Sequence, residues 1–228
     1  MTSASTIAST IPAPGVLQVN SVQARLEEIT RDFLSSLPPA ETLRAEERRA
    51  IIARYSAVLE GNFIYWMSGA YLATQCEHAR EIILENLREE IRDCHPGMMR
   101  RFAIAANAVP TEADAEAVYA DLSNVRMFVA RLSGVQMLAM MAFFEGLLQQ
   151  FMPYLAELAH LQGSHEFEYT DVHGICDIAH TEGLFRALEA ESGLSPLSPA
   201  ANLYEGVHLL RTLLDTVIRG EATPVAGD

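Results

Sequence analysis

The sequence predicts a single all-α domain of seven to eight helices. Apolar residues recur at helical spacing along most of the chain, and no stretch shows the alternating pattern of a half-buried strand. Half of the 228 residues are hydrophobic, which is enough for one sizeable core. No internal linker is long enough to divide two domains. We therefore expect one helical domain over residues 18–220, between a flexible lead-in at 1–17 and a flexible tail at 221–228.

Capping residues and prolines divide the chain into helices. Ser21 can cap the first helix, and Pro38-Pro39 end it. Thr111 opens a later helix, with Asp114 three residues on at the spacing of a capping box. The predicted helical segments are 21–34, 41–74 with a break near Gly61-Asn62, 77–91, 97–108, a helix from Thr111, 122–161 with Gly134 and Pro153 as kinks or boundaries, a helix around His173, and 200–219.

The charge of the chain excludes one class of partner. The formal net charge is -14, which argues against a nucleic-acid surface because phosphate binding needs clustered lysine and arginine. All sixteen basic residues are arginine, so the chain has no lysine and no side chain with a primary amine.

The cellular compartment is also indicated by composition. Three cysteines (Cys76, Cys94 and Cys176) are too few and too scattered for a disulfide framework, which favours a reducing cytoplasm. The N-terminal MTSASTIASTIPAPG lacks the positive and apolar regions of a signal peptide. The apolar run VQMLAMMAFF is too short to span a bilayer and fits a core helix better. We expect a cytoplasmic protein without a membrane partner.

The segment DVHGICDIAH carries three metal-binding types of side chain on one stripe. His173, Asp177 and His180 are separated by four and three residues, so at about 100° per residue they share one face of a helix. Two imidazoles and a carboxylate form a partial coordination shell for iron, manganese or zinc. The alternative is a polar surface face that happens to carry histidines.

Acidic residues elsewhere are further candidate ligands. Glu145 stands within AMMAFFEGLL, where the helix is expected to bury every face. A buried carboxylate must be neutral, paired or bound to a metal, so an ion pair with Arg131 and a metal site are both open. Glu89, Glu90 and His95 form a second cluster, whose alternative is a solvated helix face.

Two competing patterns are disfavoured. Asp177-x-x-His180 and Glu205-x-x-His208 have the carboxylate-x-x-His spacing of ferritin-like di-iron bundles. Only 28 residues separate Asp177 from Glu205, which leaves no room for the intervening helix, so His208 is expected to be a packed or surface histidine. Cys176 would need a base and a lowered pKa to act as a nucleophile, and we expect it to point away from the histidine stripe.

Taken together, these residues resemble the heme-oxygenase-like di-iron oxidases and oxygenases, a helical family related in fold to the TenA and PqqC proteins. The resemblance rests on ordered motifs: NLREEIRDCH with Asn86, Glu90 and His95, the isolated glutamate Glu145, and the closing His-x-x-x-Asp-x-x-His pattern. It runs roughly from Ala79 to Glu189, and HPGMMRRFAIAANAV is similar to a segment of the family's para-aminobenzoate-forming branch. The resemblance implies a heme-oxygenase-like bundle.

The resemblance also implies a site for two iron ions, with O2 as co-substrate. The implied ligands are Glu90, His95, Glu145, His173, Asp177 and His180. Because the spacing between the glutamate and His95 varies within the family, Glu89 stays open as an alternative to Glu90. The candidates for lining a substrate pocket are Phe63, Trp66, Phe143 and Phe144, and the alternative for each is ordinary core packing.

The function that this resemblance implies is a non-heme di-iron, O2-dependent oxygenase or oxidase of bacterial small-molecule biosynthesis. We expect an amino-acid-like substrate, oxidised at nitrogen or cleaved at a carbon–carbon bond, an external electron donor, and a homodimer. The alternatives are a fatty-acid-cleaving oxidase of the same family, a metal-free TenA-like hydrolase and a non-catalytic helical binding protein. Without lysine, no side chain has a primary amine to donate, and the guanidinium of arginine is a poor substitute, so we expect multiple turnover of a free small molecule.

Overall fold

The computed structural model describes residues 17–220, which form eight α-helices, one short 3-10 helix and no strand. This confirms the all-α prediction. The helices are α1 (Val19–Ser35), η1 (Ala40–Thr42), α2 (Ala45–Ala73), α3 (Glu77–Arg92), α4 (His95–Ala105), α5 (Glu112–Val129), α6 (Gly134–Leu161), α7 (Glu168–Leu194) and α8 (Glu205–Arg219). Residues 1–16 and 221–228, which include nearly all of the predicted flexible ends, lie outside the described residues.

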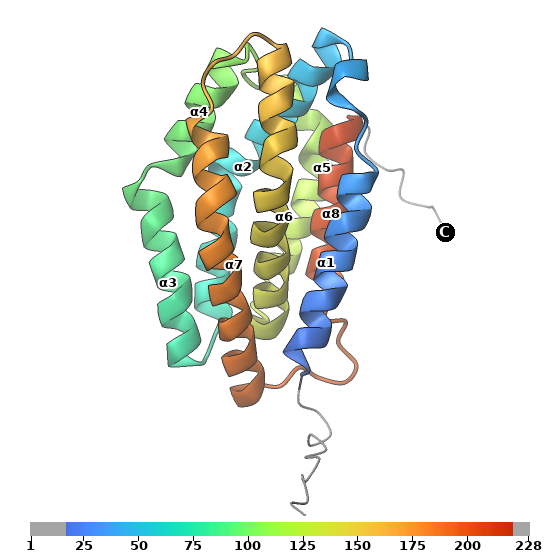
Figure 1. The fold of residues 1–228 in the computed structure, drawn as a ribbon. Coiled ribbons are helices and arrows are strands. Elements are labelled where there is room, and N and C mark those ends of the chain that lie inside the picture. The colour runs from blue at the N-terminus through green and yellow to red at the C-terminus, as the bar shows by residue number, and fades with distance from the viewer. Residues whose placement is uncertain (1–16, 221–228) are drawn as a thin grey trace, which may run out of the picture.

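Helix α6 is the centre of the bundle. It packs against α7, α2, α8 and α1, while α3 packs against α7 and α2. Figure 1 shows α3 and α7 on one side of α6, and α1, α5 and α8 on the other. Every residue from 135 to 145 in α6 is buried. The apolar run predicted to be a core helix therefore occupies the core, with Glu145 at its end.

The structure confirms one predicted boundary, at Gly134, and corrects two others. The stretch 122–161 is two helices, because Leu132 adopts a left-handed backbone (φ 54°) before Gly134 opens α6. Pro153, however, lies inside α6, where it is exposed and ends nothing. Helix α2 likewise continues through Gly61-Asn62 without a break. Burial of the remaining faces of α2 and α6 offsets the local cost of such residues in a helix.

Of the predicted starts of α1, α5 and α8, one is confirmed and two are wrong. The capping box of α5 is confirmed, because Thr111 Oγ1 accepts from the Asp114 amide and Asp114 accepts from the Thr111 amide. Ser21 is not the cap of α1: the helix begins at Val19, and the Ser21 hydroxyl donates to the Gln18 carbonyl instead. The last helix begins at Glu205, five residues later than predicted.

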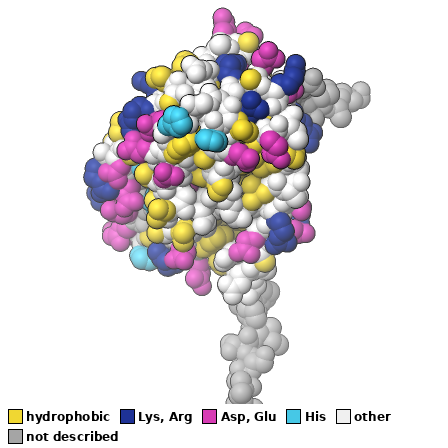
Figure 2. All heavy atoms as spheres, turned by 45° about the horizontal axis from the view of Figure 1, so that its top comes forward, with side chains coloured by type: hydrophobic (Ala, Val, Ile, Leu, Met, Phe, Trp, Pro, Cys, Tyr) yellow, Lys and Arg dark blue, Asp and Glu magenta, His cyan; other side chains and the backbone are white. Residues whose placement is uncertain are grey.

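The surface carries both signs of charge. On the face drawn in Figure 2, arginine and acidic side chains are interspersed with each other and with hydrophobic ones. The acidic excess is therefore spread over this face and does not gather into one patch. Among the helices of residues 17–220, none is both long and apolar enough to cross a membrane.

Candidate metal centre

The six predicted ligands lie in the interior, where α3, α4, α6 and α7 meet. Glu90 comes from α3, His95 from the first turn of α4, Glu145 from α6, and His173, Asp177 and His180 from α7. Each of these side chains belongs to a residue that is at most 5% exposed. They form two neighbouring groups, which differ in how their polar atoms are satisfied.

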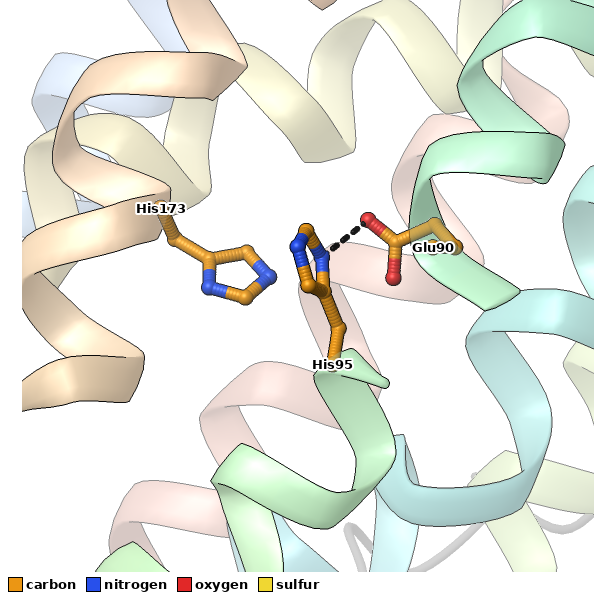
Figure 3. Close-up of side chains that lie close together, drawn as sticks. All are labelled: Glu90, His95 and His173. Carbon is orange, nitrogen blue, oxygen red and sulfur yellow. Dashed lines mark hydrogen bonds and ion pairs between the residues drawn. The ribbon is translucent and has the colours of Figure 1, made fainter. Parts of the chain in front are cut away.

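Glu90, His95 and His173 form the first group, which we call the His95 group. Ligand atoms from the three residues lie within 4.8 Å of one another. His95 Nδ1 is 2.7 Å from Glu90 Oε1, and the rings of His95 and His173 meet edge to face with centroids 4.5 Å apart. Figure 3 shows the three side chains pointing toward one another from three helices. Two imidazoles and a carboxylate in this arrangement can surround a cation.

The backbone orients the ring of His173. Its Nδ1 lies 2.8 Å from the carbonyl oxygen of Tyr169, one helical turn earlier. A carbonyl only accepts hydrogen bonds, so Nδ1 carries the proton and Nε2 keeps its lone pair. Burial is the main reason that the pKa of His173 is lowered to about 4. The ring is therefore neutral near neutral pH, which is the form that binds metals.

A tight turn between α3 and α4 brings His95 back to Glu90. Cys94, directly before α4, has a left-handed backbone with φ of 56°. Pro96 follows in the first turn of α4. Proline has no N–H group, and this costs nothing there because N–H groups of the first turn have no acceptor within the helix. The sequence placed the start of this helix at Gly97, so it missed that His95 is itself the first helical residue.

Glu145, Asp177 and His180 form the second group, which we call the His180 group. His180 Nδ1 lies 3.7 Å from Glu145 Oε2 and 3.9 Å from Asp177 Oδ1. Within residues 17–220, three buried atoms here have no hydrogen-bond partner: Glu145 Oε1, Asp177 Oδ2 and His180 Nδ1. Burying such an atom unpaired costs about 1–3 kcal/mol, so native proteins rarely leave several together. One cation bound among these three residues would satisfy them.

The electrostatics of the His180 group also favour a bound cation. Burial raises the pKa of Asp177, and the nearby charge of Glu145 raises it further. Burial also raises the pKa of Glu145. For His180, burial lowers the pKa, but the carboxylates of Glu145 and Glu89 outweigh it and raise the pKa to about 9. Carboxylates held this close need protons or a positive ion between them.

The ion pair between Glu145 and Arg131, which the sequence left open, is not formed. Arg131 pairs instead with Glu205 at the surface, at 2.6 Å. This contact also argues against a ferritin-like metal site at Glu205 and His208. Glu205 pairs with Arg131, and His208 is exposed on α8. Glu145 has no arginine partner among the described residues.

The sequence of this chain also matches a known family. The sequence model of the iron-containing redox enzymes matches residues 52–195. The chain belongs to this family. The matched region includes both groups of candidate ligands and the whole of α3, α4, α5, α6 and α7. The fold is thus the heme-oxygenase-like bundle that the resemblance implied, and its donors, carboxylate oxygens and imidazoles, suit iron. A search of curated proteins finds no match.

The two adjacent glutamates of α3, Glu89 and Glu90, have different surroundings. Consecutive helical residues point about 100° apart. Glu90 accordingly contacts His95, whereas Glu89 Oε2 lies 2.8 Å from Nε2 of His180. Sequence reasoning weighed these two residues only as alternatives. It missed that each carboxylate contacts a different histidine.

A buried tyrosine pair adjoins the His95 group and was also missed. The hydroxyl groups of Tyr55 and Tyr169 are 2.9 Å apart, and the Tyr169 ring lies 4.3 Å from that of His173. Burial raises the pKa of both hydroxyls, so they stay protonated. The position of Tyr169, four residues before His173, was the one signal of this contact in the sequence.

Cys176 differs from its predicted orientation. It was expected to point away from the histidine stripe, but its Sγ lies 3.3 Å from Asp177 Oδ1 and close to His180 as well. Burial and the adjacent Asp177 raise the pKa of the thiol. A protonated thiol is a poor nucleophile, so the structure gives no support to cysteine catalysis.

A narrow apolar cleft reaches the His95 group from the surface. Its lining includes Leu59, Phe63, Met99, Leu148 and Tyr169, with Glu90, His95 and His173 at the buried end and the partly exposed Glu60, Ile64 and Pro96 at the mouth. Its free volume is about 20 Å³, room for about one water-sized molecule.

Of the four predicted pocket residues, Phe63 lines this cleft. Trp66 and Phe144 pack edge to face in the core, with centroids 5.5 Å apart. Phe143 lines a separate groove between α1, α6 and α7. These three aromatic residues therefore do not line the cleft that reaches the candidate ligands.

Proposed function

We propose that the chain is a non-heme di-iron enzyme that uses O2 to oxidise a small organic molecule. The His95 group would hold one iron and the His180 group the other. The observation that carries this proposal is that three buried atoms of the His180 group have no partner among residues 17–220, beside a second group of three residues that could hold a metal ion. Carboxylates and imidazoles suit iron or manganese, whereas structural zinc sites more often use thiolates.

The chain's own residues prepare the site. Reduced iron held by these residues would supply the electrons for activation of O2. The Tyr169 carbonyl holds His173 in the tautomer whose Nε2 is free to bind. The carbon-lined cleft limits the access of water to the His95 group, which strengthens every electrostatic interaction inside it.

Iron stoichiometry tests the proposal directly. Protein purified without oxygen is loaded with Fe(II), and bound iron per chain is measured by a colorimetric assay. O2 uptake is then followed with an electrode in the presence of a reductant. We expect two iron ions per chain and O2 uptake that depends on them. A single iron per chain would contradict the di-iron assignment, and two irons without O2 uptake would contradict the use of O2.

The mouth of the cleft supports an amino-acid-like substrate. Glu60 and Arg100 form an ion pair there, and Arg100 is largely exposed. An amino acid could present its ammonium group to Glu60 and its carboxylate to Arg100 at the mouth. An apolar side chain would enter the cleft only if the cleft widened, because its free volume is about 20 Å³. Opening a surface ion pair costs only about 0–1 kcal/mol. A fatty acid carries one negative charge and would leave Glu60 without a partner, so the mouth favours the amino acid.

This substrate class can be tested separately. Apolar amino acids and fatty acids of matching length are compared as triggers of O2 uptake by the iron-loaded protein. We expect amino acids to stimulate uptake, and Arg100→Gln to raise the KM for the amino acid. Arg88→Gln, on the exposed face of α3, is the control and should leave KM unchanged. Stimulation by fatty acids alone would favour a fatty-acid substrate over an amino acid.

The resemblance of the motifs supports a role in bacterial small-molecule biosynthesis.

A further inference from the structure

The two ring nitrogens of His180 face different surroundings. Nδ1 points toward the carboxylates of Glu145 and Asp177, at 3.7 and 3.9 Å, and makes no hydrogen bond within residues 17–220. Nε2 lies 2.8 Å from Glu89 Oε2. The buried polar atoms without partners therefore lie on the Nδ1 side of the His180 ring. Glu89 lies on the opposite side, next to Nε2.

This contact determines where the proton of the ring resides when His180 binds a metal. A carboxylate oxygen accepts hydrogen bonds, so the proton stays on Nε2, whose N–H group donates a hydrogen bond to Glu89. The lone pair then remains on Nδ1, directed toward Glu145 and Asp177. Histidines that bind metals commonly donate their other N–H to a carboxylate or a carbonyl, which fixes the tautomer and the ring orientation.

In the His95 group, His173 is held in the same way, but through its other ring nitrogen. His173 donates Nδ1–H to the Tyr169 carbonyl and keeps Nε2 free, whereas His180 donates Nε2–H and keeps Nδ1 free. Helix α3 thus serves both groups: Glu90 contributes its carboxylate to the His95 group, and Glu89 supports the His180 group. Their exposure agrees with this division, because the Glu90 side chain is 4% exposed and that of Glu89 is 34% exposed.

We propose that Glu89 is a positioning residue of the second iron site, which orients His180 without binding the metal itself. This inference rests on the proposed di-iron function. It assigns the two adjacent glutamates different tasks. Loss of a partner of this kind typically lowers metal affinity by about 10–100-fold, whereas loss of a ligand removes the metal.

The test compares removal of the Glu89 side chain with its conservative replacement. Metal-free protein is titrated with Fe(II) alone under anaerobic conditions. We expect Glu89→Ala to keep two sites but to weaken one of them by about 10–100-fold. Glu89→Gln should restore most of the affinity, because an amide oxygen can still accept from Nε2. Glu90→Gln should lose one iron, because an amide replaces a ligand carboxylate.

A matched control and a second probe complete the design. Glu85 lies on the exposed part of α3, so Glu85→Ala should bind Fe(II) like the unmodified chain. Co(II), whose visible spectrum reports its coordination, should show an altered second site in Glu89→Ala with unchanged stoichiometry. Loss of an iron in both Glu89 variants would make Glu89 a ligand, and normal affinity in Glu89→Ala would make it a bystander. Either result overturns the inference while the unmodified chain still binds two irons. If the unmodified chain itself fails to bind two, the proposed function fails first and the inference falls with it.

Discussion

The carboxyl groups of Glu145 on α6 and Asp177 on α7 lie buried against the same nitrogen of His180, and neither has an arginine partner among residues 17–220. In most proteins a buried carboxylate is paired or hydrogen-bonded. Here one oxygen of each carboxylate has no hydrogen-bond partner. The metal-free chain should therefore be strained at this point, and metal binding should relieve the strain.

Replacing Glu145 should separate stability from metal binding. In metal-free protein near neutral pH, Glu145→Gln removes a buried carboxylate whose desolvation outweighs its attraction to His180, so we expect the free energy of unfolding to rise by about 1 kcal/mol. The same change removes a ligand carboxylate, so Fe(II) occupancy of the His180 group should fall. Denaturant unfolding and iron content measure the two effects. A variant that binds two irons normally would show that Glu145 is not a ligand.

The pH dependence of stability should report the raised pKa of Asp177. A carboxyl whose pKa is raised by folding stabilises the protein most below its ordinary pKa, and this contribution is lost as pH rises through the raised value. Unfolding free energies of metal-free wild type and Asp177→Asn are compared between about pH 5 and about pH 8. We expect wild type to lose stability relative to the variant as pH rises. A difference that does not change with pH would mean that Asp177 ionises normally.

His180 and His208 provide a matched pair for metal content. His180 is buried in the His180 group, whereas His208 is exposed on α8 within the ferritin-like spacing. We expect His180→Ala to lose at least one iron per chain and to abolish O2 uptake, and His208→Ala to retain both. Iron content and O2 electrode traces of the two variants decide the matter. Equal iron content in both variants would remove the central assignment.

Helical spacing explains what could be predicted about the site from sequence. Residues at separations of three and four share a helix face in any packing, so His173, Asp177 and His180 could be grouped without a structure. Glu145 stood out because apolar residues surround it in the sequence. The contact between Glu89 and His180 depends on how α3 lies against α7, and local spacing contains no such information.

The same limit explains why three of the four predicted pocket residues do not line the cleft, and why two helix boundaries were wrong. Phe143 and Phe144 are neighbours in sequence and both are buried, yet Phe143 borders a groove between α1, α6 and α7 while Phe144 packs against Trp66, since adjacent helical positions face different helices. The predicted break in α2 and the doubtful boundary at Pro153 rested on local propensity. Propensity amounts to about 1 kcal/mol for glycine and about 3 for proline, which burial along a long helix can exceed.

Close packing of α8 against α5 should make Gly206 intolerant of a side chain. A Cβ there would lie 2.4 Å from Phe128 Cε1, so we expect Gly206→Ala to destabilise the protein by about 1–3 kcal/mol through overpacking. Gly61 in α2 is the control, because a Cβ there meets nothing within 4 Å. Gly61→Ala should stabilise by about 0.5–1 kcal/mol, as alanine is preferred inside helices. Thermal unfolding of both variants measures the contrast, and equal midpoints would disprove the predicted clash.

The absence of lysine leads to the last prediction, which concerns the fate of the protein during reaction. An enzyme that donated an amine nitrogen from its own side chains would need a primary amine, and the sixteen basic side chains here are all guanidinium groups. Guanidinium is a delocalised cation that stays protonated, so it is a poor source of nitrogen. We therefore expect a free small molecule to be consumed over many turnovers while the chain stays chemically unchanged. Intact mass is measured before and after incubation with Fe(II), O2 and a reductant, with and without candidate amino acids. A stoichiometric loss of mass from the chain, with an aromatic amine released in the absence of added substrate, would show instead that the protein consumes itself.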